Sequence, residues 1–210
     1  MKLPRIAGGL MWFFALLLGG CGGDSPSNVA SDPTTAKDLV LRQTDLPKGW
    51  KATAALPFAH CGSNPFRHAP DRSKARFASG LADLQNMVVI FESEKQAEAA
   101  YTKLTSESGF RCFRRRAEAE ISEYSGGKIL KPLRALEKVR FGSAAEGRRM
   151  SVEVESAIGP VFVYVDVAYA REGPTVMFLK LSCGLAQLKK PFFERIARLA
   201  TLRIDSSREA

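Results

Sequence analysis

The chain opens with an uninterrupted apolar run, Ile6–Leu18, which follows two positive charges at Lys2 and Arg5. The run has 13 residues, whereas a transmembrane helix needs about 20. A short apolar run behind positive charges is typical of the core of a signal peptide. The next segment, residues 22–36, is rich in Gly, Ser, Pro and Asp and has little apolar surface to bury. It predicts a flexible tether in front of a folded domain.

Helical periodicity, with apolar residues recurring at three and four, marks several segments of the remaining chain. Helices are predicted over 36–43, 94–107, 110–124 and 187–203. Ser93 is placed to cap the second helix, and Ser108 with Gly109 interrupts the pattern before the third. Within the third helix, Arg116 and Glu120 are spaced four apart and can pair weakly along the helix surface.

Strand patterns fill most of the rest, and the clearest alternates Met150, Val152 and Val154 with polar residues. Five strands are predicted, over 76–80, 87–91, 150–155, 161–167 and 177–183. Residues 51–73 hold three prolines and both histidines, and they predict a long irregular loop. The fold class that follows is α+β: an antiparallel sheet of about five strands with packed helices, in a single domain.

Length and charge fit this organisation. The 210 residues, 45% hydrophobic and 25% charged, are typical of a globular chain. The predicted division is a signal peptide over 1–20, a tether over 21–36, the α+β domain over 37–205 and a disordered tail over 206–210. The net charge of +9 falls to +7 without Lys2 and Arg5. Such a charge serves solubility alone or attracts anionic lipid headgroups and cell-wall polymers.

The end of the apolar run resembles the lipobox of bacterial type II signal peptides. Leu18-Gly19-Gly20-Cys21 gives an aliphatic residue, two small residues and a cysteine. The resemblance implies cleavage before Cys21 and transfer of diacylglycerol to its sulfur, with fatty acyl groups such as palmitate. The expectation is a lipoprotein on the extracytoplasmic face of the cell membrane, with the lipid as its anchor.

The predicted domain resembles a group of actinobacterial lipoproteins whose exported domain opens with D-L-P-x-G-W, here Asp45–Trp50. These domains are similar to the extracytoplasmic sensor domain of certain mycobacterial serine/threonine kinases. In them a cysteine follows in the next loop, then a strand, a helix with a second cysteine, three strands and a last helix. The resemblance implies a sensor-like fold outside the cytoplasm, and it carries no catalytic residue.

The same order of parts implies a disulfide between Cys61 and Cys112, which would attach the long loop to a helix. Outside the cytoplasm such a bridge persists, and closing a loop of about 50 residues is worth on the order of 4 kcal/mol. Cys183 shares strand parity with Leu179 and Leu181, which favours a buried thiol. Pairings through Cys183, within the chain or to another chain, stay open.

Metal and cofactor chemistry is weakly supported. His60, Cys61 and His68 lie in one loop and include ligand types that zinc accepts. Their spacing matches no established zinc pattern, however, and an oxidised Cys61 could not bind a metal. The prediction is therefore no metal and no cofactor.

Hydrolytic chemistry lacks a motif, because no serine lies in a G-x-S-x-G elbow. Glu153, Glu155 and Asp166 fall on strand positions expected to face solvent. A pair of carboxylates converging in space cannot be read from sequence, so an envelope hydrolase stays the alternative from another class. Nucleic-acid binding has neither a recognisable motif nor the right compartment.

Phe162 and Tyr164 alternate with the valines of the 161–167 strand and so lie on the opposite sheet face. If that face is open, they form a possible ligand face; if helices cover both faces, they belong to the core. The leading hypothesis is a non-enzymatic, membrane-tethered binding or sensor-like domain for an envelope component or a partner protein. A purely structural envelope lipoprotein is the third hypothesis.

Overall fold

Seven strands form one antiparallel sheet in the described part of the computed structural model, in the order β1-β2-β3-β7-β6-β5-β4. The structure describes residues 34–55, 64–125, 128–140, 145–156, 159–184 and 190–205. The strands are β1 (Lys51–Thr53), β2 (Asp71–Ser79), β3 (Ala82–Ile90), β4 (Ile129–Arg140), β5 (Ala145–Ser156), β6 (Gly159–Glu172) and β7 (Thr175–Gly184). The helices are α1 (Ala36–Leu39), the 3-10 turn η1 (Gln43–Asp45), α2 (Glu94–Thr105), α3 (Glu107–Ser125) and α4 (Lys190–Asp205).

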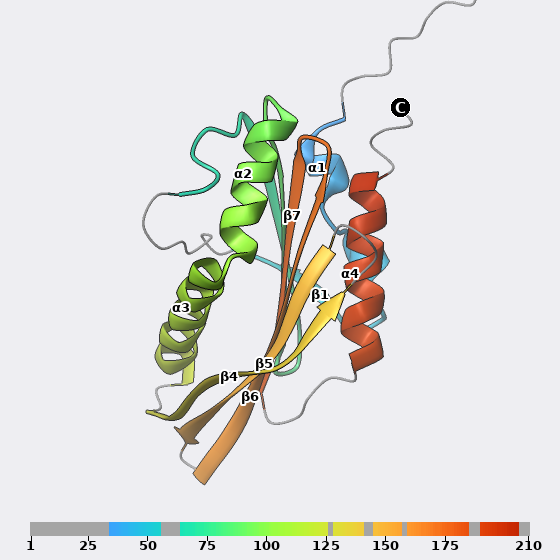
Figure 1. Ribbon diagram of the computed structural model, residues 1–210. Helices are drawn as coiled ribbons and strands as arrows, with labels where there is room; N and C mark the ends of the chain where they lie inside the picture. Colours follow the sequence, from blue (N-terminus) through green and yellow to red (C-terminus); the bar gives the residue numbers. More distant parts are fainter. Residues whose placement is uncertain are drawn as a thin grey trace, which may run out of the picture. The chain divides into compact units, whose positions relative to one another are not determined.

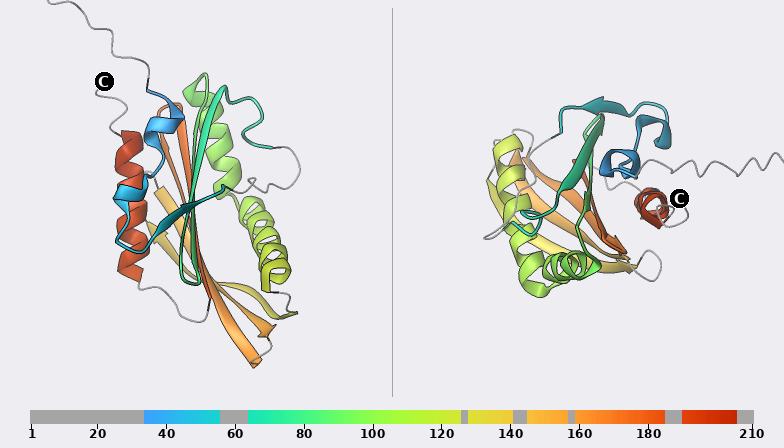
Figure 2. Two further views of the ribbon diagram at one scale, coloured as in Figure 1. Left: turned by 180° about the vertical axis from the view of Figure 1, so that it is seen from behind. Right: turned by 90° about the horizontal axis from the view of Figure 1, so that it is seen from above.

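Helices lie on both faces of the sheet, with α2 and α3 on one side and α1 and α4 on the other (Figures 1 and 2). Each face has its own core. The first core packs strand residues such as Leu84 and Leu179 against Phe193 and Ile196 of α4. The second core contains the strand residues that point to the other face of the sheet, such as Phe178, and these pack against α2 and α3. The α+β class with an antiparallel sheet is therefore confirmed.

The prediction of about five strands is wrong in number, because β1 and β4 add two. β1 has only three residues, all exposed, so it carries no hydrophobic pattern. It lies within the segment predicted as a loop, residues 51–73, which also contains the start of β2. β4 contains Pro132, and register shifts interrupt its pairing with β5. Proline and irregular register both hide a strand from pattern analysis, and both are tolerated because β4 is an edge strand.

The three long helices lie close to their predicted ranges, whereas the helix predicted over 36–43 ends at Leu39. Ser93 caps α2 by accepting a hydrogen bond from the Gln96 N–H at 3.4 Å. The break before α3 falls at Ser106 rather than at Ser108 and Gly109, which lie inside the first turn of α3. In α4, Phe193 is buried in the first core, whereas its neighbour Phe192 is partly buried.

The D-L-P-x-G-W motif folds back onto the last helix. Gly49 has a φ of +98°, which an L side chain rarely adopts, so glycine is required at this turn. The turn delivers Trp50 into the first core, where its ring stacks on Phe192 of α4 with 5.7 Å between centroids. The motif therefore places Trp50 in the first core.

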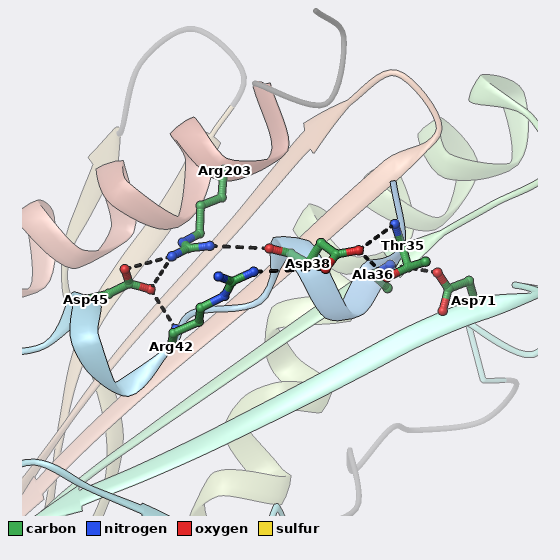
Figure 3. A network of polar contacts seen from close by, with 7 residues as sticks. All are labelled: Thr35, Ala36, Asp38, Arg42, Asp45, Asp71 and Arg203. Carbon is green, nitrogen blue, oxygen red and sulfur yellow. Dashed lines mark hydrogen bonds and ion pairs between the residues drawn. The ribbon is translucent and has the colours of Figure 1, made fainter. Parts of the chain in front are cut away.

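Polar contacts reinforce the packing of the motif on α4 (Figure 3). The Arg203 guanidinium donates to Asp45 Oδ1 at 2.7 Å and to the Asp38 carbonyl at 3.3 Å. Asp45 Oδ2 also accepts from the Arg42 N–H at 2.6 Å, which holds the 3-10 turn. Hydrogen bonds from the side chain and the backbone of Thr35 lower the pKa of Asp38. The motif therefore has a structural role that its sequence does not reveal.

Asn86 of β3 joins three parts of the fold through one buried amide. Its side-chain oxygen accepts from the Leu41 N–H at 2.8 Å, and its amide nitrogen donates to the Phe178 carbonyl at 3.0 Å. The residue is 1% exposed. Because buried backbone groups need partners, Asn86 fixes the segment after α1 onto the centre of the sheet.

Candidate functional site: a groove between α3 and the sheet

Three neighbouring strands place polar side chains side by side near the middle of the sheet. The antiparallel register aligns Arg76 of β2, Gln85 of β3 and Lys180 of β7 in one row. Successive side chains of a strand alternate between faces. This row therefore projects to the same face as Met87 and Phe178, which belong to the second core beside α2 and α3.

The next row and α3 enclose a groove on this face. Asp83 of β3 lies opposite Ser182 of β7, which is aligned in turn with Val165 of β6. Ala117 and Ile121 of α3 line the opposite wall, and the enclosed volume is about 300 Å³. Figure 1 shows α3 beside the sheet on the side away from α4. A volume of this size is at the small end of the range of small-molecule sites.

Lys180 brings a deeply buried charge into the groove. Its side chain is 7% exposed, and Nζ donates to Glu120 Oε1 at 2.6 Å and Oε2 at 2.7 Å. Glu120 comes from α3, and its side chain is 31% exposed. A buried ammonium group has lost its hydration and needs an anionic partner. The pair therefore connects α3 to β7, the fourth of the seven strands in the sheet.

A second ion pair lies at the β2–β3 side of the groove. Arg76 Nε donates to Asp83 Oδ2 at 2.6 Å, while Asp83 Oδ1 accepts from the Gln85 amide at 2.9 Å. On the same face, β2 also carries Arg72 and Lys74 at alternate positions. The pKa of Lys74 is lowered, first by partial burial and then by the charge of Arg72. Of these three basic residues only Arg76 lines the groove, while Arg72 and Lys74 continue the row along β2 beyond it.

Lys180 is not among the site residues predicted from sequence, although its neighbourhood in the sequence carries a signal. The strand reads Val176-Met177-Phe178-Leu179-Lys180-Leu181, and both faces of this strand are buried. A single lysine inside an apolar strand buried on both faces must have an anionic partner. The identity of that partner, Glu120 on a helix 60 positions earlier in the chain, cannot be read from sequence.

Phe162 and Tyr164, the predicted ligand face, lie on the opposite side of the sheet from the groove. They share strand parity with Ala168, which belongs to the first core beside α4. Phe162 is 48% exposed, and its ring centroid lies 6.5 Å from that of Tyr164. Helices on both faces weaken the hypothesis of a fully open sheet face, and a ligand role for these two aromatic residues stays a prediction.

The cysteines are placed only in part. Cys183 is buried in the first core with Leu179 and Leu181, as its strand parity predicts, and it does not form a disulfide. Cys112 lies on α3. Cys21 and Cys61 are outside the described residues, so the lipid anchor and the Cys61–Cys112 bridge stay predictions.

The prediction that Asp166 faces solvent is wrong. Asp166 is buried, and both of its oxygens accept from the Arg149 guanidinium, at 2.8 and 2.9 Å. Its strand face lies under α4, so the polar residue in the alternating pattern marks a buried ion pair. Glu153 is also more enclosed than predicted and pairs with Lys131 Nζ at 2.6 Å. Glu155 is exposed, as predicted.

The loop that was considered as a zinc site and predicted to hold no metal is described over 51–55 and 64–73, where His68 is exposed. His60 and Cys61 lie outside the described residues. Within the described ranges, no group of three or more His, Cys, Asp or Glu side chains is placed to hold a metal ion. In the same part of the chain, no helix combines the length and the apolar character needed to cross a bilayer.

Comparison with known proteins identifies the fold rather than a family. No protein-family model matches the sequence. No curated protein matches it either. Among solved structures, the chain resembles the extracellular domain of PknH from Mycobacterium tuberculosis, with a TM-score of 0.52 and 10% identity over 85% of this chain and 98% of that one. The Ran-binding protein Mog1p of Saccharomyces cerevisiae is more distant, with a TM-score of 0.31 and 13% identity over 78% of this chain and 83% of that one. The chain therefore has a fold similar to that of the PknH extracellular domain.

Proposed function

We propose that this protein is a membrane-anchored, extracytoplasmic and non-enzymatic domain that binds an envelope component or a partner protein, as a sensor-like module. The observation that carries the proposal is the groove under α3, whose floor holds the buried Lys180. The likeness to the extracellular domain of PknH supports the extracytoplasmic location and the sensor-like character. The lipobox at Cys21 supports the anchor.

The charges of the groove favour binding over catalysis. Both oxygens of Glu120 accept from Lys180, and both oxygens of Asp83 accept from Arg76 and Gln85. A general base must lie within hydrogen-bond reach of the proton that it removes, and all four of these oxygens already contact donors of the protein itself. These two acids are therefore suited to recognition and structure.

The anchor is tested at Cys21. Replacing Cys21 with serine removes the sulfur that would accept diacylglycerol. We expect the variant to lose metabolic labelling by fatty acid and to lose retention in the membrane fraction, while the unchanged chain keeps both. Labelling and retention equal to those of the unchanged chain would exclude a lipid anchor at this residue.

The groove is tested with a photoreactive amino acid at Leu81, which lines the groove and is 65% exposed. Leu202 on α4 is 61% exposed and serves as the matched control on the other side of the sheet. Irradiation of cells that export each variant should give a discrete adduct, lipid or protein, from position 81 and none from position 202. Equal adducts from both positions, or none from position 81, would contradict binding in the groove.

A further inference from the structure

We propose that the groove recognises an amphipathic carboxylate, whose head group takes the place of Glu120 on Lys180 and whose apolar chain lies along the wall formed by α3 and β6. This inference rests on the proposed function, since it names the chemical class of the groove's ligand. The two partners of the ion pair differ in burial, because Lys180 is enclosed by the sheet and Glu120 is partly exposed to solvent.

Lys180 cannot leave the groove. It belongs to β7, which is hydrogen-bonded to β3 on one side and to β6 on the other. Its side chain is 7% exposed, so any movement that breaks the ion pair leaves a cation without solvent or partner. A buried cation of this kind strongly requires some anion at its position.

Glu120, in contrast, can be replaced. It lies on the surface helix α3 with a side chain that is 31% exposed, so a change of rotamer returns its carboxylate to water at modest cost. Both oxygens contact Nζ, at 2.6 and 2.7 Å. Glu120 therefore stands in for a ligand carboxylate, and it marks where that head group would bind.

The walls of the groove select the rest of the ligand. Val163 and Val165 of β6 line one side, and Ile121 of α3 lines the other. These side chains offer no hydrogen bonds, so they favour an alkyl or similar apolar chain. An ion with no apolar part would bury little apolar surface against these walls. A neutral apolar molecule would form no ion pair with Lys180.

The test uses a medium-chain carboxylate that carries a diazirine in its chain, with the corresponding neutral alcohol as the control probe. The full chain, as processed by its host, is held in nanodiscs of neutral phosphatidylcholine and irradiated with each probe. Mass mapping should place the carboxylate adducts on the α3 segment around Ala117 and Ile121 and on β6 around Val165. The alcohol should label these segments at least about tenfold less, because its hydroxyl can accept a hydrogen bond from Lys180 but brings no negative charge to pair with the ammonium group.

Two variants separate recognition from a purely structural role of the ion pair. Lys180→Met keeps most of the apolar stem of the side chain and removes its charge, and it should reduce carboxylate labelling about tenfold while changing alcohol labelling much less. Glu120→Gln removes the internal competitor and should raise carboxylate labelling by roughly the same factor. Thermal unfolding of both variants in the same nanodiscs verifies that the fold persists.

The inference is overturned if the two probes label equally, if the adducts spread over the surface, or if neither variant changes the carboxylate signal. Stronger labelling of the groove by an alkyl phosphate probe would overturn the choice of a carboxylate. If Leu81 yields an adduct in cells while the carboxylate probe fails, the proposed function stands and this inference falls. If both fail, the groove is not a binding site.

Discussion

Replacing Gly109 with alanine is expected to destabilise the protein by about 3 kcal/mol, although alanine is the better helix former. A Cβ at this position would lie 2.3 Å from the Lys103 carbonyl oxygen and 2.5 Å from that of Leu104. These atoms belong to the backbone of α2, so they cannot rotate away. In an isolated helix the same change would stabilise by about 1 kcal/mol. The sign of the effect therefore tests how closely the two helices meet.

Chemical denaturation of the Gly109→Ala variant measures the change in the free energy of unfolding. In thermal unfolding, the melting temperature of the variant should fall by about 6 to 12 °C. The matched control is Ser108→Ala, one position earlier in the same turn, where the side chain is exposed. That variant should change the free energy of unfolding by no more than about 0.5 kcal/mol. Equal stability of Gly109→Ala and the unchanged chain would show that α3 starts further from α2.

The second large effect is expected at the buried pair between β5 and β6. Asp166→Leu leaves the Arg149 guanidinium, whose side chain is 7% exposed, without its carboxylate. Removing one partner of a buried ion pair costs about 3 to 5 kcal/mol. We expect a loss of about 4 kcal/mol in the free energy of unfolding, measured by denaturant titration.

The double variant Arg149→Met with Asp166→Leu isolates the cause. Because it removes both charges together, it should recover most of the stability that the single variant loses. A double variant as unstable as Asp166→Leu would mean that packing, and not the unpaired charge, determines the loss. The matching pair on the other face, Lys180 and Glu120, is more exposed at its carboxylate, so its single variants should cost less.

The sequence predicted those parts of the fold in which local pattern and burial agree. The strand around Val152 alternates cleanly, and Ser93 marks the start of α2. β4 was missed because proline and register shifts erase the alternation along an edge strand. The break between α2 and α3 was misplaced by a few residues because Gly109 serves close packing rather than helix termination.

The candidate site was beyond the reach of sequence patterns, for a physical reason. A polar residue in a strand predicts exposure only if no helix covers that face, and coverage depends on the tertiary structure. Asp166 and Lys180 both break this rule, since their partners come from a neighbouring strand and from a helix. Glu120, predicted to pair weakly along its own helix, reaches across to the sheet instead.

The path of β2 has a consequence for access to the groove. The first described residues meet the sheet where the Ala36 N–H donates to Asp71, at the start of β2. Leu81, at the groove, follows the other end of the same strand. At about 3.3 Å per residue, the two points are separated by roughly 25 Å. A support that holds the chain near Ala36 would therefore be attached at the end of β2 opposite to Leu81.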